Sequence, residues 1–396
     1  MTTKLLHLLT FAGMLLCSSF TSAFAAQMPL TQWETLAPDE VGEARRSADE
    51  LLRQIKHDYT DQGKRAFRDA HPRGIGCVAA TFTVEPNLPL KYRTGVFAVP
   101  GKSYDSIIRF SSSLGPVGDQ AKDARGMAIK LFGVPGTKLL EDQPNAGTHD
   151  FLQINARTFP AKNTHDFAGL VRIKTNPLNA IAFLRESPIA HALVLKAAFS
   201  LSSGNPNNGK SLAEMQFFSM VPYLMKGSSI NTPVKFTSRP CAGVAQRSLD
   251  GSDGELRNDL QSRLNEGDVC YDFLYQFYRD GAGYDVENGM SDWGGDPTLF
   301  TKFATINIQK QTFLTDEKLH YCDNLSMQPW HALAEHQPLG NINRARKIIY
   351  EVISKSRHAT NNESNKYLEP TSSTDFQALR DPKFSVWDAI KVPAAN

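Results

Sequence analysis

The sequence predicts an α+β protein built on one closed antiparallel β-sheet, with a helical arm before the sheet and helices after it. The first observation is a series of short runs from Gly76 onward in which apolar and polar residues alternate between Gly, Pro and Asp turns. The second is apolar residues at helical spacing before these runs and again near the C-terminal end. Because no helical pattern separates the first strands, they indicate an antiparallel barrel or sandwich and not a parallel α/β sheet.

The first predicted element is a helix from Pro38 to about His57. Proline suits the first turn of a helix, and the acids Asp39 and Glu40 interact favourably with the helix dipole there. Apolar residues then recur at helical spacing: Val41, Ala44, Ala48, Leu51, Leu52 and Ile55. We interpret residues 26–66 as an N-terminal helical arm that packs on another part of the protein.

The strands and the later helices follow the arm. The runs with strand character are Val78–Val84, Tyr92–Val99, Ile107–Ser112, Met127–Phe132, Phe151–Asn155, Val234–Thr237 and Phe303–Gln309. Helices are predicted for Ala180–Leu201, Ser211–Leu224 and Ile342–Ser356. We expect one barrel domain with helical insertions over residues 67–360 and a polar tail over 361–396, although length alone suggests two or three domains.

The composition excludes several classes of protein. The 396 residues include 43 Lys and Arg against 41 Asp and Glu, which is a formal net charge of +2. This balance gives no broad basic field, so no nucleic-acid partner is expected. With 41% hydrophobic and 21% charged residues, the chain is neither disordered nor a disulfide-dense miniprotein.

Residues 1–25 resemble a cleaved signal peptide, which predicts a periplasmic or secreted protein. Lys4 precedes an apolar stretch, Leu5–Phe20, and Ala23 and Ala25 are the small residues expected before cleavage at Ala26. Cys17 could mark a lipoprotein, but the bulky Leu16 before it disfavours that alternative. No later run approaches about 18 apolar residues, so no membrane span is expected.

Four cysteines remain after the signal peptide, namely Cys77, Cys241, Cys270 and Cys322. Cys77 stands in an apolar run and is predicted to be a buried free thiol. A Cys241–Cys270 disulfide is a candidate, since an exported protein folds under oxidising conditions. There is no Cys-x-x-Cys or Cys/His cluster, so a structural zinc site is not predicted.

Three segments carry residues typical of a chemical site. The first is Arg68-Asp-Ala-His71-Pro-Arg-Gly-Ile-Gly76, immediately before the first strand. The second is Arg109-Phe-Ser111-Ser, followed by Asp123-Ala-Arg125-Gly126. The third is Arg346-Lys-Ile-Ile-Tyr350, with Arg357 seven residues further on.

These segments resemble the catalase superfamily, and in particular its short exported haem-binding members. The first is similar to the catalase segment that carries the distal catalytic His. The second is similar to the family's Arg-Phe-Ser strand and Asp-Pro-Arg-Gly turn, with Ala124 in place of Pro. The third is similar to the helix that carries the proximal Tyr ligand. The likeness is specific over Arg68–Phe159 and patchier over Phe217–Arg357.

The resemblance implies a catalase-like closed antiparallel β-barrel with a haem b cofactor. Tyr350 would ligate the iron, with Arg346 one helical turn earlier to stabilise its phenolate. His71 would be the catalytic acid–base group that moves a proton between the two peroxide oxygens. The other residues that it places at the cofactor are Arg68, Arg109, Ser111, Phe151 and Arg357; of these, Arg68, Arg109 and Arg357 would pair with the propionates.

One departure concerns the distal amide. Catalases place an Asn here, but ungapped alignment puts Gly147 at that position, and Asn145 would have to replace it after a small shift of the loop. Without this amide, we expect poorer orientation of peroxide.

A second alternative concerns the register of the C-terminal segment. Residues 340–344 could match the family's Asn-Arg strand before the proximal helix, in which case Tyr350 would have no ligand role.

Other polar groups are interpreted as structural. Asp123 and Arg125 are expected to form an ion pair within a turn, and the pairs His149/Asp150 and His165/Asp166 to be loop residues. His331 and Glu335 are expected on a packed helix surface, and the Gly-rich segment 292–296 lacks the context of a phosphate loop.

The leading hypothesis is therefore a haem-dependent peroxidase or catalase-like oxidoreductase. Its substrate would be hydrogen peroxide or an organic hydroperoxide, used with a small-molecule reductant. A second hypothesis retains the haem without efficient turnover. A third is a haem-free barrel that binds an apolar ligand or a partner. The sequence leaves the preferred substrate and the oligomeric state open, a homo-oligomer included.

Overall fold

The computed structural model describes residues 30–113, 118–201, 205 and 208–362. The predicted signal peptide and most of the predicted tail lie outside these ranges. Within them, no helix is both long enough and apolar enough to cross a membrane.

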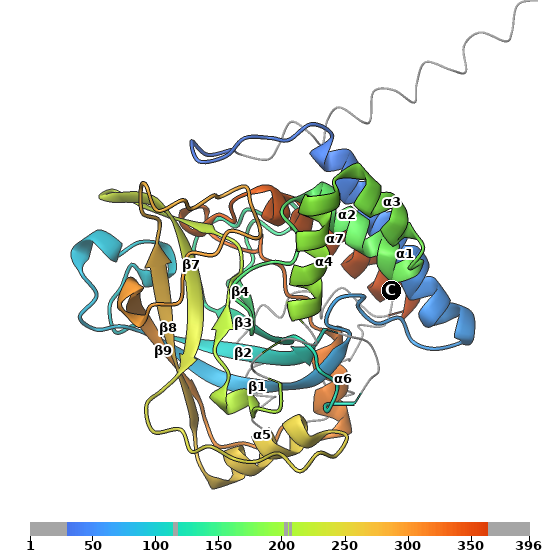
Figure 1. The fold of residues 1–396 in the computed structure, drawn as a ribbon. Helices are drawn as coiled ribbons and strands as arrows, with labels where there is room; N and C mark the ends of the chain where they lie inside the picture. Colours follow the sequence, from blue (N-terminus) through green and yellow to red (C-terminus); the bar gives the residue numbers. More distant parts are fainter. Residues whose placement is uncertain (1–29, 114–117, 202–204, 206–207, 363–396) are drawn as a thin grey trace, which may run out of the picture.

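An eight-stranded antiparallel ring forms the centre of the molecule (Figure 1). Its strands, in order around the ring, are β5 (Phe217–Phe218), β4 (Thr148–Ile154), β3 (Arg125–Phe132), β2 (Ser103–Ser112), β1 (Arg73–Val84), β9 (Phe300–Ile308), β8 (Val269–Phe277) and β7 (Ile230–Pro240). The short strand β5 closes the ring because it pairs with both β4 and β7. A ninth strand, β6 (Tyr223–Gly227), adds to the outer edge of β7. The predicted closed α+β barrel is confirmed.

The interior of the barrel is an aromatic core. Phe82, Phe97, Phe151 and Phe273 contact one another there, with ring centroids 4.9–6.5 Å apart. Strand β1 is buried on both faces, since Val78, Ala80 and Phe82 face this core while Cys77 and Ala79 belong to a second cluster. That second cluster lies on the outer face of the barrel wall, where helices cover it.

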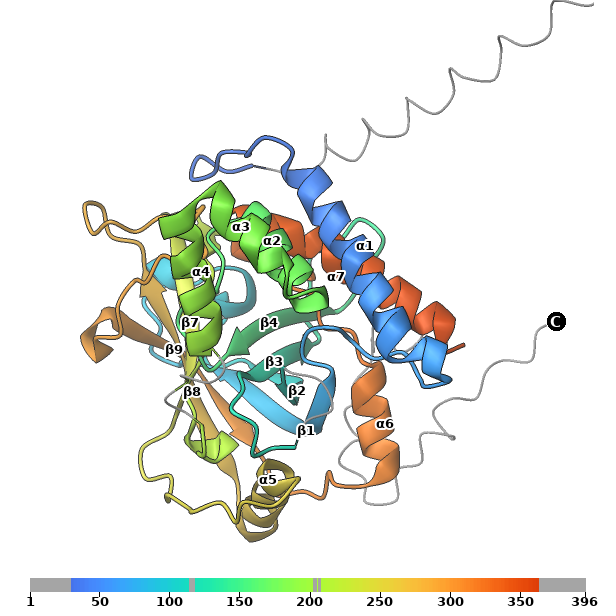
Figure 2. The same cartoon turned by 45° about the vertical axis from the view of Figure 1, so that its right-hand side comes forward.

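Two groups of helices cover the barrel wall. The N-terminal arm helix α1 (Glu40–Asp58) packs on α2 (Thr164–Thr175) and α7 (Asn341–Thr360) through Ala44, Ala48, Val171 and Ile349 (Figure 1). Helix α6 (Asp316–Asn324) lies beside β1 on the same side of the barrel (Figure 2), and the disulfide Cys77–Cys322 joins the two elements. The prediction that Cys77 is a free thiol is therefore wrong, whereas the candidate disulfide Cys241–Cys270 is confirmed.

Some predicted elements are wrong for local reasons. Residues 92–99 form no strand but lie in 3₁₀ turns, Leu90–Tyr92 and Gly95–Phe97, because Gly95 has a positive φ of 52° that ends an extended chain. The predicted helix over 211–224 is a 3₁₀ turn (Leu212–Glu214) followed by β5 and the start of β6, with Met220 at a φ of 62° and Pro222 at the interruption.

The predicted helix Ala180–Leu201 is divided into α3 (Asn179–Glu186) and α4 (Pro188–Leu201). Pro188 lacks an amide donor and disfavours the helical conformation of the residue before it, and Ser187 has a φ of −155°. The sequence interpretation missed α2, α5 (Glu255–Glu266), α6 and β8.

Candidate functional site

His71 lies just before β1, held against the outer face of the barrel wall. Its ring Nδ1 is 3.2 Å from the Ser111 hydroxyl, and Arg109 donates a 3.1 Å hydrogen bond to its backbone carbonyl. Both partners come from β2, whose residues Ser111 and Arg109 face the same side of the strand. A Cβ on Gly126 of the next strand would lie 2.8 Å from Nδ1 of His71, so this glycine makes room for the imidazole ring.

The surroundings of His71 keep its imidazole neutral. Burial, together with the positive charges of Arg109 and Arg346, lowers the pKa of His71 to about 3. A neutral imidazole offers one nitrogen as a proton acceptor, so His71 has the protonation state required of a general base at neutral pH.

A cluster of arginines lies beside His71, at the C-terminal end of α6. Arg68 and Arg357 donate hydrogen bonds of 3.0 and 2.8 Å to the backbone carbonyl of Asp323. Arg109 is 4.0 Å from the Asp323 carboxylate, and Arg65 donates to the Asn324 side chain. We call Arg65, Arg68, Arg109 and Arg357 the arginine cluster.

Two members of the arginine cluster, Arg68 and Arg109, hold positive charges close together beside Asp323. Burial and the charges of Arg109 and Arg357 lower the pKa of Arg68, and Asp323 provides the opposing negative charge. The buried Nε of Arg109 has no hydrogen-bond partner among the described residues. Buried charges are normally paired, so this cluster is suited to bind an additional anionic group.

Helix α7 places Tyr350 near the same outer face of the barrel. Arg346, one turn earlier, donates a 3.3 Å hydrogen bond to the Tyr350 hydroxyl, and Asn343 accepts a 3.0 Å bond from Arg346. Because α7 begins at Asn341, residues 341–344 are helical and not a strand. The alternative register, which needed a strand at 340–344, is therefore contradicted.

Apolar side chains of the barrel wall pack against the Tyr350 ring. This outer cluster includes Cys77, Ala79 and Ile107, with Ala128 and Leu152 from the neighbouring strands. Burial lowers the pKa of the Arg109 guanidinium overall, whereas Tyr350 lies close enough to raise that pKa in part. Arg109 in turn donates a hydrogen bond to the carbonyl of His71. The structure thus brings His71, Ser111, Arg68, Arg109, Arg346, Tyr350 and Arg357 to one side of the barrel.

Two predicted site residues lie elsewhere. Phe151 points into the barrel interior, where it packs on Phe82 and Phe273, because alternate residues of β4 face opposite sides. Its neighbour Leu152 is the residue on the outer face near Tyr350. Phe151 therefore does not lie on the side of the barrel where the other predicted site residues meet.

Asn145 is exposed in a turn before β4 and does not lie beside His71. Gly126, which lies against His71, pairs with Ile154 at the far end of β4, whereas Thr148 at the near end pairs with Phe132. Six residues of strand separate these two pairs, which is about 20 Å along the sheet. The proposed distal role of Asn145 does not fit this placement.

The sequence interpretation missed residues that position the site. The carbonyl of Asp323 holds two arginines, Asn343 orients Arg346, and Leu152 belongs to the outer cluster on which Tyr350 packs. The period of two in β4 could have identified Leu152, since Phe151 continues the core-facing series. Nothing in the local sequence indicates Asp323, because its role depends on where α6 packs.

The other polar groups also differ in part from expectation. Asp123 and Arg125 form the expected ion pair at 3.6 Å. Asp150 is not a loop residue but a fully buried residue of β4 that accepts a hydrogen bond from Lys130 at 2.7 Å. Burial raises the pKa of Asp150, but the charges of Lys130 and the nearby His331 outweigh it and lower the pKa overall. His331 is buried beside Thr148 and does not lie on a helix surface.

Of the comparisons with known proteins, only the one with solved structures found matches. No protein-family model matches the chain, and no match was found among curated proteins. Among solved structures, a fungal catalase superposes with a TM-score of 0.57 at 16% identity, over 91% of this chain and 68% of the catalase. Catalase A from Saccharomyces cerevisiae superposes with a TM-score of 0.60 at 14% identity, over 93% of this chain and 76% of that enzyme. The chain therefore has a fold similar to that of these catalases.

Proposed function

We propose that the protein binds haem b between the outer face of the barrel and α7, and that it acts on hydrogen peroxide or an organic hydroperoxide. The observation that carries this proposal is the position of Arg346. It donates to the Tyr350 hydroxyl and also lies close enough to His71 to lower the pKa of that histidine. The candidate iron ligand and the candidate proton acceptor therefore flank one region.

The donor set of this region fits a haem. The two propionates would pair with Arg68 and Arg109, and the unsatisfied Nε of Arg109 would gain an acceptor. Tyr350 would hold the iron as a phenolate, which the hydrogen bond from Arg346 favours. The apolar side chains of the outer cluster would contact the porphyrin ring.

The chain's own residues would position and move a proton. Haem iron, when bound, supplies the redox chemistry of O–O bond cleavage. His71, neutral at physiological pH, would accept a proton from one peroxide oxygen and return it to the leaving oxygen. Ser111 would hold the ring through Nδ1, which leaves Nε2 for this transfer. A small-molecule reductant would complete a peroxidase cycle.

A second candidate function is haem binding without efficient peroxide turnover. The exposed position of Asn145 favours it, because this residue lies in the turn before Thr148, at the end of β4 opposite to the Ile154 end that pairs with Gly126. A site without this amide relies on His71 alone to orient peroxide.

The test begins with the purified chain after expression with added haem. We expect a Soret band with a high-spin ferric spectrum, which Tyr350→Phe abolishes. The control Tyr92→Phe removes a hydroxyl from a ring that stacks on Phe277, away from the site, and should retain the band. A colourless wild-type protein, or equal haem content in Tyr350→Phe, would contradict the proposal.

Turnover is tested separately by peroxide consumption. His71→Ala should lower it by about 10²–10⁴-fold, the usual contribution of a general acid–base group, while His57→Ala on the exposed face of α1 should not. Haem binding with no consumption in the wild type would favour the second candidate function.

We also propose that the protein acts outside the cytoplasm. The signal-like residues 1–25 support this, as do the two disulfides, Cys77–Cys322 and Cys241–Cys270. Cell fractionation followed by N-terminal sequencing should place the mature protein outside the cytoplasm, with Ala26 as its first residue. An intact Met1 in the cytoplasmic fraction would contradict this.

A further inference from the structure

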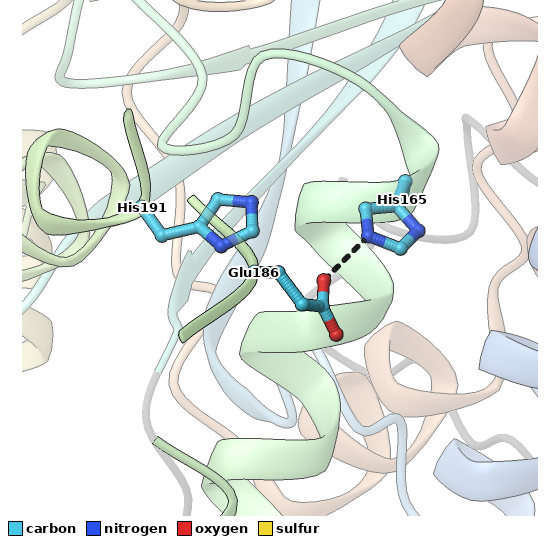
Figure 3. A group of neighbouring side chains, drawn as sticks. All are labelled: His165, Glu186 and His191. Atoms are coloured by element: carbon cyan, nitrogen blue, oxygen red, sulfur yellow. Dashed lines mark hydrogen bonds and ion pairs between the residues drawn. The ribbon is translucent and has the colours of Figure 1, made fainter. Parts of the chain in front are cut away.

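A group of metal-ligating side chains lies on helices α2, α3 and α4. His165 is in the first turn of α2, Glu186 ends α3 and His191 is in α4. One ligand atom from each residue lies within 4.8 Å of the others. Figure 3 shows the Glu186 side chain between the two histidines, which come from separate helices. The sequence interpretation of His165 as a loop residue is therefore wrong.

Each histidine is held by a partner on Nδ1. Nδ1 of His165 lies 3.2 Å from a carboxylate oxygen of Glu43 on α1. Nδ1 of the buried His191 bonds the backbone carbonyl of Phe183, and its ring stacks on the Phe183 ring with centroids 3.8 Å apart. Metal-binding histidines commonly use one nitrogen for such a carboxylate or carbonyl partner, which fixes the ring and leaves the other nitrogen for the metal.

The remaining donors have spacings that suit a tetrahedral ion. Nε2 of His165 is 3.0 Å from a Glu186 oxygen, and one donor atom from each of His165, Glu186 and His191 lies within 4.8 Å of the other two. Ligands about 2.0–2.1 Å from a tetrahedral zinc ion are about 3.3 Å from one another. The side chain of Glu186 is 47% exposed, so it can swing to close the wider separations.

We propose that His165, Glu186 and His191 bind one Zn²⁺ ion, with a water molecule in the fourth position. Imidazole nitrogens with carboxylate oxygens form a donor set that suits zinc. The site would join α2, α3 and α4, and Glu43 would act as a positioning residue from α1. The absence of cysteine motifs in the sequence led to the opposite expectation, because these ligands come from three helices and follow no short spacing.

The test uses the full mature chain, stripped with a chelator and titrated with ZnCl₂ against a chromophoric zinc indicator. We expect the wild type to bind one Zn²⁺ ion tightly per chain, and its melting temperature to rise when zinc is added. His165→Gln and Glu186→Gln should each weaken zinc binding at least about tenfold and abolish that rise. Both side chains are about half exposed, so these variants should fold.

Matched controls change similar residues elsewhere. His57→Gln and Glu266→Gln alter exposed side chains on α1 and α5 and should leave zinc affinity unchanged. Equal zinc affinity in the wild type and the His165→Gln/Glu186→Gln double variant would overturn the proposal, and so would a wild type that binds no zinc.

Cobalt substitution tests the geometry and the role of Glu43. The wild type with Co²⁺ should show the intense visible bands of a tetrahedral centre. Glu43→Gln should keep these bands, since the donor atoms are unchanged, while it lowers the affinity by about 10–100-fold, as is usual for a lost partner of a metal-bound histidine. Weak octahedral bands in the wild type would contradict the assigned ligand set.

Discussion

At the scale of single residues, His71 has an uncommon backbone conformation. Its φ is 56°, a left-handed conformation that L-residues adopt infrequently and that surrounding contacts must hold. Those contacts are the hydrogen bond from Arg109 to its carbonyl and the proximity of Ser111 to its ring. This arrangement directs the ring towards the outer face of β2 and β3.

The first prediction concerns Gly126, which allows that placement. A Cβ in Gly126→Ala would lie 2.6 Å from the Ser111 hydroxyl and 2.8 Å from Nδ1 of His71, so the ring must move. We expect peroxide consumption to fall by about tenfold or more while the haem content, held by Tyr350, is retained. Absorption spectra and peroxide kinetics of the purified variant measure the two effects.

Gly267→Ala is the matched control for this change. A Cβ at Gly267 meets no atom within 4 Å, and its φ of −175° is extended backbone that alanine adopts readily. If Gly126→Ala consumes peroxide at the same rate as Gly267→Ala, the ring of His71 has no catalytic role in that position.

At the scale of elements, the disulfide Cys77–Cys322 connects the barrel wall to the arginine cluster. Cys77 is on β1, and Cys322 directly precedes Asp323, whose carbonyl accepts from Arg68 and Arg357. The second disulfide, Cys241–Cys270, connects the end of β7 to β8, and β9 separates these strands from β1.

The second prediction compares the removal of each disulfide. The loop closed by Cys77–Cys322 spans 245 residues and that closed by Cys241–Cys270 spans 29, so loss of chain-closure entropy predicts destabilisation of about 5.5 and about 3.6 kcal/mol. Urea unfolding of Cys77→Ala/Cys322→Ala and Cys241→Ala/Cys270→Ala measures both. Only the first pair should also weaken haem retention, because it releases α6 from β1.

Haem retention shows whether the first disulfide only stabilises the whole protein or also holds Asp323 in place. Equal loss of haem in both double variants would show that the effect follows stability alone. Equal retention in both would show that Asp323 keeps its place without the disulfide.

At the scale of the whole molecule, several histidines are buried in the neutral form. Burial lowers the pKa of His336 to about 3, and burial with the charge of Arg357 lowers the pKa of His358 to about 3. Burial and the neighbouring His336 also lower the pKa of His149. In the unfolded chain these groups titrate near about 6.5.

The third prediction is a loss of stability in mild acid. Between about pH 6.5 and pH 3, the unfolded chain binds protons that the folded chain does not, so the free energy of unfolding decreases as the pH falls through this range. Each buried histidine contributes up to about 1.4 kcal/mol per pH unit. Urea unfolding at pH 7.5, 6 and 5 measures the slope.

His336→Gln isolates one contribution to that slope. A glutamine oxygen can still accept the 3.0 Å hydrogen bond from the Val96 amide, but it does not titrate. The slope should therefore decrease in His336→Gln and stay unchanged in the exposed control His57→Gln. An unchanged slope in His336→Gln would show that folding does not lower the pKa of His336.

The sequence by itself determined the local parts of this protein. The period of two predicted most strands of the barrel, and helical spacing predicted α1 and α7, because these patterns depend only on which side of an element is buried. The motif resemblance also singled out His71, Arg346 and Tyr350 as candidate residues. Arg346 and Tyr350 meet because an i, i+4 pair lies on one helix face whatever surrounds it.

Only the tertiary structure decided how distant segments meet. Closure of the ring by β5, the disulfide between β1 and α6, and the anchoring of two arginines by the Asp323 carbonyl all join residues far apart in the chain. The side of β4 that Phe151 faces, and the meeting of His165 with Glu186 and His191, also depend on packing. Local patterns specify an element and its buried side, but the partner that covers that side is selected by the burial of the whole core.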